Sequence, residues 1–271
     1  MAAVDYSALD SPQASGSSFY PRRHWTETPE GAVDYAITVE DGVQLSGRFF
    51  AVGRENPTVL FFYGNGETAA GYDTVAPFYN RIGANFFVVD YRGYGASGGS
   101  PAFNPMLSDA RKVLDWLRST MAELRFTGPL YVMGRSMGRH SAFELAAASS
   151  PSPLAGEGRG EGGVTINGVI IESGRPNLGR FTLGLDAAAA QALEDAYHAK
   201  VYSISIPTLV IHGQMDETAP IADAIAMHDN IQAEHKHLVI IPAAGHNDLM
   251  YVGFRQYFEA IRRFIVRYAV G

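Results

Sequence analysis

Short apolar runs recur along the chain, and within them apolar and polar residues do not alternate. Six such runs, each four to six residues long, follow one another: Thr58–Tyr63, Asn85–Asp90, Leu130–Met133, Gly168–Glu172, Thr208–His212 and His237–Ile241. Continuous apolar strands are typical of a parallel sheet whose two faces are both covered by helices. The pattern therefore predicts the strands of such a sheet.

Segments of helical character separate the runs: Tyr72–Ile82, Met106–Leu124, Met137–Ala148, Ile221–Ile231 and Asn247–Tyr268. Alternating strands and helices predict an α/β protein with a doubly wound, mostly parallel sheet. Ahead of these runs, Val33–Val39 and Gln44–Val52 flank Glu40-Asp41-Gly42, and an Asp-Gly turn between two apolar segments is typical of a β-hairpin. We therefore expect an N-terminal antiparallel hairpin at one edge of the sheet.

Three segments depart from this alternation. Residues 1–23 are rich in Ser, Ala and Pro, and we expect a loosely ordered lead-in to a single domain at 24–271. Residues 149–163 read SSPSPLAGEGRGEGG, which favours a mobile surface insert; a nucleic-acid-binding tract would need more than one Arg. Residues 173–205 are expected to form a small cap with one helix near Leu185–Lys200.

Composition narrows the classes of function. The 271 residues carry 21 Lys and Arg against 28 Asp and Glu, and this net charge of −7 argues against nucleic acid as a partner. Cysteine is absent, which excludes disulfides, thiolate catalysis and Cys-ligated metals. The sequence contains neither a membrane-spanning stretch nor the cationic and apolar regions of a secretory signal, so a cytoplasmic protein is expected.

Two segments fit the pattern G-x-S-x-G, namely Gly134–Gly138 around Ser136 and Gly95–Gly99 around Ser97. Around a nucleophilic serine this pattern makes a sharp turn from a strand into a helix, with no room for side chains at the glycines. An apolar strand precedes Ser136 and helix-forming residues follow it, whereas glycines and a proline after Ser97 forbid an immediate helix. We therefore predict that Ser136 is the nucleophile and that Ser97 lies in a loop at the rim of the site. The alternative is that Ser136 is a surface-turn serine.

His246 is the candidate base among eight histidines, because it lies in a loop of small residues directly after the last apolar run. Asp216 is the candidate acid, because it follows the preceding run closely. A carboxylate there can accept the second imidazole N–H and fix the tautomer. Two alternatives remain open: Asp216 caps the next helix, or Glu172, which ends an earlier run, is the acid.

An oxyanion also needs two backbone N–H donors. Met137, directly after the predicted nucleophile, supplies one at a helix N-terminus, and Asn65, after the first parallel run, is the candidate for the other. Parallel strands share one direction, so residues that follow different strands meet at one edge of the sheet. We therefore expect Asn65, Ser136, Asp216 and His246 to gather there.

As a set, several phrases resemble the α/β-hydrolase superfamily, above all its minimal-lid branch of depalmitoylase-like and related bacterial serine hydrolases: FFYGNGET, VVDYRGYGASGGSP, GRSMG, IPTLVIHGQMDETAP and IPAAGHND. The resemblance implies an α/β-hydrolase fold with a Ser136–Asp216–His246 triad and an oxyanion hole at Asn65 and Met137. The sequence departs from the family pattern at Tyr63-Gly64, where His-Gly is frequent, and at Arg139, where a Gly is common.

The implied reaction is acyl transfer from a small-molecule ester or thioester through an acyl-enzyme, and it requires no metal or organic cofactor. One alternative is a serine peptidase acting on short peptides. The other is a binding protein that retains the fold without catalysis.

Overall fold

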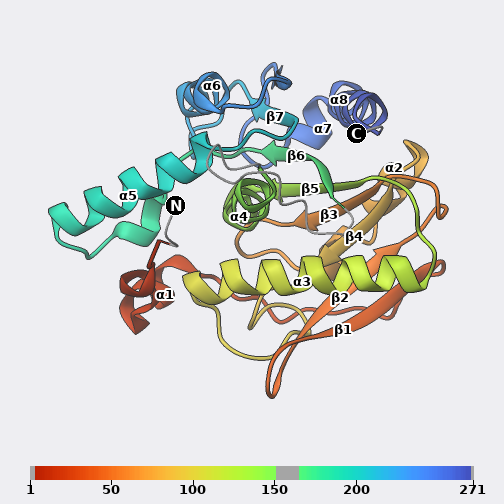
Figure 1. Cartoon of the computed structure of the whole chain (residues 1–271), viewed down its shortest axis with the longest axis horizontal. Helices are drawn as coiled ribbons and strands as arrows, with labels where there is room; N and C mark the ends of the chain where they lie inside the picture. Colours follow the sequence, from red (N-terminus) through yellow and green to blue (C-terminus); the bar gives the residue numbers. More distant parts are fainter. Residues whose placement is uncertain (1–3, 151–164, 270–271) are drawn as a thin grey trace, which may run out of the picture.

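The computed structural model describes residues 4–150 and 165–269. Its eight-stranded sheet has the order β1-β2-β4-β3-β5-β6-β7-β8, with helices on both faces (Figure 1). At one edge β1 (Ala32–Glu40) and β2 (Val43–Phe50) form an antiparallel hairpin, and β2 is also antiparallel to β4. The remaining neighbours are parallel. The doubly wound sheet with its N-terminal hairpin is therefore confirmed.

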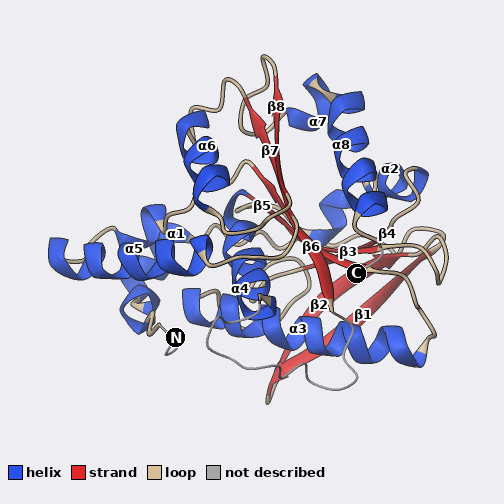
Figure 2. Ribbon diagram, turned by 45° about the horizontal axis from the view of Figure 1, so that its top comes forward, coloured by secondary structure: helices blue, strands red, loops and turns tan. Residues whose placement is uncertain are grey.

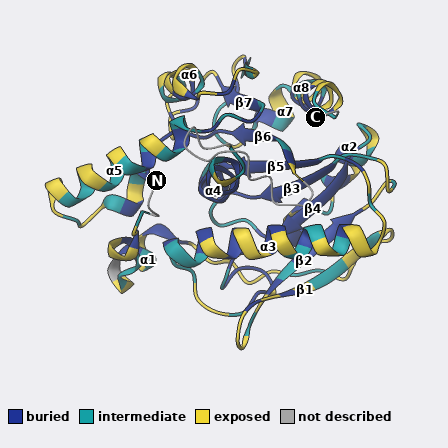
Figure 3. Cartoon of the chain, in the orientation of Figure 1, coloured by how far each residue is buried: buried dark blue, intermediate teal, exposed yellow. Residues whose placement is uncertain are grey.

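All six predicted parallel strands form within two residues of their expected ends. They are β3 (Thr58–Phe62), β4 (Asn85–Val89), β5 (Leu130–Arg135), β6 (Ile166–Glu172), β7 (Thr208–Gly213) and β8 (Lys236–Ile241). The inner strands are buried almost throughout, while the edge strand β8 is half-buried (Figure 3). Helices on both faces leave the inner strands no polar side, which explains why their sequences do not alternate.

Two helical layers enclose the sheet (Figure 2). On one face α2 (Ala76–Arg81) meets α8 (Phe254–Arg267), where the rings of Phe78 and Phe258 lie 5.7 Å apart. The other face is covered by α3 (Phe103–Glu123), α4 (Arg139–Ser149) and α6 (Ile221–Asn230).

The last predicted helix, over Asn247–Tyr268, is divided into α7 (Leu249–Val252) and α8. Gly253 between them has φ −114° and ψ 39°, outside the helical range. Its backbone lies so close to Ile241 that a Cβ would overlap that side chain. The close approach to β8 therefore accompanies the break in the helix.

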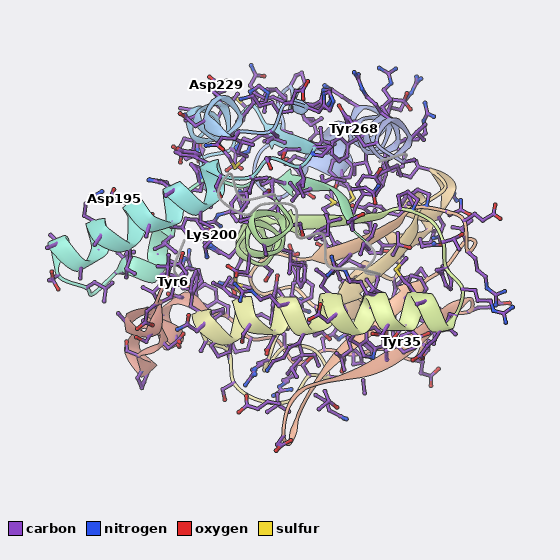
Figure 4. The ribbon with its side chains drawn as sticks, in the orientation of Figure 1. Tyr6, Tyr35, Asp195, Lys200, Asp229 and Tyr268 are labelled. Carbon is purple, nitrogen blue, oxygen red and sulfur yellow. The ribbon has the colours of Figure 1, made fainter. Side chains whose placement is uncertain are left out.

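The N-terminal segment differs from the loosely ordered lead-in that composition predicts. Residues 4–23 contain η1 (Ser7–Asp10) and α1 (Pro12–Ser18), and they bury Tyr6, Leu9 and Phe19. The Tyr6 ring lies 5.3 Å from that of Phe103 on α3. Figure 4 labels Tyr6 near Lys200, whose Nζ lies 4.5 Å from the Tyr6 ring centre. A few large apolar side chains are enough to anchor a polar segment when they enter an existing core.

The predicted cap, residues 173–205, is here named the cap segment. It contains a short helix η4 (Gly179–Thr182) and the long helix α5 (Ala187–Tyr202), close to the predicted range. The Asp186 carboxylate accepts the N–H groups of Ala188 and Ala189 and so begins α5. Most of the predicted insert at 149–163 lies outside the described residues. None of the helices described has both the length and the apolar character needed to cross a membrane.

The packing of the N-terminal segment leads to a stability prediction. Leu9 is fully buried, so Leu9→Ala should lower the free energy of unfolding by about 2–5 kcal/mol, as measured by urea denaturation. Leu183→Ala is the matched control, because Leu183 is 66% exposed and its truncation should cost less than about 0.5 kcal/mol. Equal effects of the two variants would mean that the segment is only loosely attached.

Candidate active site

Three of the predicted side chains form one hydrogen-bonded chain. The Ser136 Oγ lies 2.8 Å from His246 Nε2, and His246 Nδ1 lies 2.7 Å from Asp216 Oδ2. The residues follow β5, β7 and β8, so the common direction of these strands brings them to one edge of the sheet. Because a carboxylate only accepts hydrogen bonds, Nδ1 carries the proton and Nε2 is left to accept from the Ser136 hydroxyl.

The Asp216 carboxylate is held in place from two sides. It is 5% exposed, and its Oδ1 accepts the backbone N–H groups of Thr218 and Ala219 at 2.9 and 2.7 Å. Burial raises the pKa of Asp216, but hydrogen bonds from His246 and Ala219 outweigh it and the pKa is lowered from its usual value. The side chain is therefore an anion at neutral pH. It accepts hydrogen bonds from the loop before α6 and also orients the imidazole.

The backbone at Ser136 is held in the left-handed region, with φ 50°. This conformation costs a non-glycine residue about 1–3 kcal/mol and turns the chain sharply from β5 into α4. A Cβ at Gly134 would meet the Gly138 carbonyl oxygen at 2.6 Å, and a Cβ at Gly138 would overlap the carbonyl of Phe62 in β3. The two glycines of the motif are thus required by the close approach of α4 to the sheet.

Ser97 is not at the rim of the site, and that prediction was wrong. The residue is fully buried; its hydroxyl accepts the Ser46 N–H at 2.8 Å and donates to the Asp90 carbonyl at 3.2 Å. It therefore ties the loop after β4 to β2. Gly95, at φ 50°, permits this fold-back, because a Cβ there would overlap the Asp90 carboxylate.

The reserve acid Glu172 is engaged elsewhere. Its carboxylate accepts from Arg135 Nε at 3.1 Å and from the Tyr257 hydroxyl at 2.7 Å. Arg135 also pairs with Glu67, and its Nη2 donates to the Asn247 side chain at 2.8 Å. This ion group borders the site, and the Arg135 contact with Asn247 fixes the loop that carries His246. The G-x-S-x-G motif gave no means to anticipate that role.

Both predicted oxyanion donors line a cavity of about 260 Å³ together with Ser136 and His246. Met137 lies in the first turn of η3 (Ser136–Gly138), where backbone N–H groups have no acceptor inside the helix. The Asn65 side chain accepts from the Tyr20 N–H at 2.9 Å and donates to the Ser18 carbonyl at 2.7 Å. The N-terminal segment thus borders the cavity and holds the Asn65 loop.

Arg139, at which the sequence departs from the α/β-hydrolase pattern it resembles, is buried beside the cavity. Its guanidinium donates to the carbonyl oxygens of Ser136, Arg175 and Asn177 at 2.8–2.9 Å. Burial lowers the pKa of Arg139 to about 10, so the side chain remains a cation at neutral pH. It therefore fastens the start of the cap segment to the turn that carries Ser136.

Comparisons with known proteins agree with this architecture. A family model described as Hydrolase_4, serine aminopeptidase S33, matches residues 53–156. An uncharacterized protein of Mycobacterium tuberculosis is 28% identical over 249 residues, which cover 88% of this chain and 80% of the relative. The human alpha/beta hydrolase domain-containing protein 17B is 28% identical over 214 residues, 77% of this chain and 66% of its own length.

Among solved structures, that of the Pyrococcus furiosus esterase Pf2001 superposes with a TM-score of 0.70 at 20% identity. The match covers 92% of this chain and 99% of the esterase. The chain therefore has the α/β-hydrolase fold, with the eight-stranded sheet and interleaved helices described above.

The close approach of η3 to β3 at Gly138 gives a second stability prediction. Because Gly138→Ala places a methyl group on the Phe62 carbonyl, thermal or urea unfolding should show a loss of about 2 kcal/mol or more. Gly71→Ala is the control, since its Cβ would meet only the Thr68 hydroxyl, at an ordinary 3.7 Å. If the two variants unfold alike, the glycine is not needed at this turn.

Proposed function

We propose that this chain, which has the α/β-hydrolase fold and matches a serine aminopeptidase family model over residues 53–156, is a serine hydrolase that cleaves carboxylic esters or thioesters through an acyl-enzyme on Ser136. The observation that carries the proposal is the unbroken hydrogen-bonded chain from Asp216 through His246 to the Ser136 hydroxyl, which borders the cavity. Nucleophile, base and orienting acid are the three groups that such catalysis requires.

In the first half-reaction His246 Nε2 takes the Ser136 proton as Oγ bonds to the substrate carbonyl carbon. The carbonyl oxygen becomes an anion, and the backbone N–H groups of Met137 and Asn65 are the proposed donors that stabilise it. When the carbonyl re-forms, the bond to the leaving group breaks and the His246 proton passes to that group. Asp216 stays ionised throughout and stabilises the transient imidazolium.

In the second half-reaction water replaces the leaving group. His246 takes a proton from the water as its oxygen attacks the acyl carbon, and the proton then returns to Ser136 Oγ as the acyl bond breaks. The products are a carboxylic acid and the free enzyme. Every proton step uses the same imidazole nitrogen, which requires the tautomer that Asp216 holds.

The description of the matched family favours a second candidate, an aminopeptidase. An aminopeptidase binds the cationic amino end of its substrate, and a carboxylate usually pairs with that amine. Glu67 is a carboxylate on this cavity, and it is already paired with Arg135 and accepts from the Tyr72 hydroxyl. The charge of the cavity therefore favours the esterase proposal, which the esterase fold neighbour also supports.

The first test of function removes the nucleophile. Ser136→Ala should lower kcat for 4-nitrophenyl butyrate by at least about 10³-fold, because the acyl-enzyme has no other oxygen on which to form. Ser97→Ala is the matched control; it removes the serine of the second G-x-S-x-G and should keep activity within about tenfold. If Ser97→Ala abolishes turnover in a folded protein and Ser136→Ala does not, the nucleophile is misassigned. Faster cleavage of short peptide anilides than of esters would favour the peptidase.

A second test concerns the acid. Asp216→Asn should lower kcat by about 10³–10⁴-fold in a protein with an unchanged circular-dichroism spectrum, because an amide can donate to Nδ1 and favour the wrong tautomer. Steady-state kinetics on the same ester measures the effect. Retention of activity within tenfold, with loss in Glu172→Gln, would transfer the role to Glu172.

A further inference from the structure

The cavity beside Ser136 carries an unusual balance of charge. Four arginines line it: Arg135, Arg139, Arg175 and Arg180. Only Arg135 is matched by carboxylates, those of Glu67 and Glu172. Within the described residues, none of the other three arginines makes an ion pair with a carboxylate. The positive charge stands out because the whole chain has a net charge of −7.

One of the unmatched cations has a structural role. Arg139 is saturated by three carbonyl oxygens and cannot turn toward a ligand without breaking those hydrogen bonds. Its charge still acts on the cavity, since it is buried and little water screens it. Arg139 also fixes the backbone position of Arg175, because its Nε donates to the Arg175 carbonyl at 2.9 Å.

Arg175 and Arg180 are free to act on a ligand. Arg175 is half-buried, and its guanidinium lies over Gly179, where a Cβ would stand only 2.7 Å from Nη2. Arg180 lies over the Tyr20 ring, 5.2 Å from its centre, and donates to the Tyr20 hydroxyl at 2.8 Å. Stacking on an aromatic ring orients a guanidinium without neutralising it. Both side chains therefore keep a positive charge at the cavity.

Guanidinium groups bind carboxylate and phosphate through paired N–H donors, and such charge-assisted hydrogen bonds are about twice as strong as neutral ones. Positive charge gathered in a cleft also raises the local concentration of an anionic ligand. The same charge repels a substrate with a free amino group and adds no electrostatic attraction for a neutral substrate. Charge is therefore the property by which this cavity could select among esters.

We propose that the substrate is an ester or thioester that carries an anionic group, a carboxylate or a phosphate, and that Arg175 and Arg180 bind that group while Ser136 attacks the acyl carbon. The proposal rests on the proposed function, because it places the anion relative to that nucleophile. It names Arg175 and Arg180 as residues that determine specificity, both supplied by the cap segment.

A series of esters with one leaving group and one chain length tests the proposal on the acyl side. The esters are 4-nitrophenyl hexanoate, mono-4-nitrophenyl adipate and 4-nitrophenyl 5-phosphonopentanoate, which end in a methyl, a carboxylate and a phosphonate. A second pair tests the leaving-group side: 4-acetoxybenzoate has a carboxylate on its leaving group, and its methyl ester is the neutral counterpart. We expect kcat/KM to be at least about tenfold higher for the anionic member of at least one series, and the better of adipate and phosphonate identifies the anion.

Arginine variants then assign the preference. Arg175→Gln and Arg180→Gln should each lower the anionic-to-neutral ratio of kcat/KM by about tenfold, the change expected when a hydrogen bond between charged groups is lost. Arg180 is exposed, so its substitution does not threaten folding. Arg54→Gln is the control, because it also removes one positive charge from an exposed position. Arg54 precedes β3 and so lies at the amino ends of the parallel strands, away from the site, and its substitution should leave the ratio unchanged.

The outcomes separate the two proposals. Hydrolysis of the neutral esters without preference for any anionic one, or a preference that both arginine variants retain, overturns the anionic substrate and leaves the esterase intact. Absence of turnover for every ester overturns both proposals.

Discussion

At Gly138, the last residue of η3 before α4 begins, the backbone approaches β3 so closely that no side chain fits between them, and the placement of Ser136 depends on this contact. The turn holds Ser136 at φ 50°, a conformation that β5 on one side and α4 on the other maintain from within the core. A more distant α4 would let the turn relax, and the hydroxyl would leave the edge where β7 and β8 deliver Asp216 and His246. The proposed chemistry of the site thus depends on this backbone packing.

Around this turn, two arginines connect segments that are distant in the chain. Arg135 joins Glu67, Glu172 and the loop of His246 into one buried ion group. Removing one partner of a buried ion group leaves an unpaired charge, at a cost of about 3–5 kcal/mol. Arg139 similarly binds the cap segment to the turn. The arginines thus both hold the site together and determine its charge.

The sequence was sufficient to predict the sheet and the four residues at its edge. Continuous apolar runs identified β3 to β8, and residues at the ends of parallel strands must lie at one edge, so Ser136 and His246 could be placed without coordinates. The burial of Ser97 was not predictable, because it depends on a loop folding back on β2. Neither the burial of Leu9 nor the position of Arg175 and Arg180 at the cavity was predictable. Both depend on contacts between distant segments, which the periodicity of the sequence does not encode.

Mapping the site of a covalent adduct tests directly whether Asp216 and His246 activate Ser136. The protein is treated with a fluorophosphonate, which phosphonylates activated serines, and the modified peptide is identified by mass spectrometry. We expect one adduct, on Ser136, whose formation is lost in Asp216→Asn because the imidazole is no longer held toward the hydroxyl. An adduct on another serine would mean that Ser136 is not the nucleophile, and undiminished labelling of Ser136 without the Asp216 carboxylate would mean that Asp216 does not orient His246.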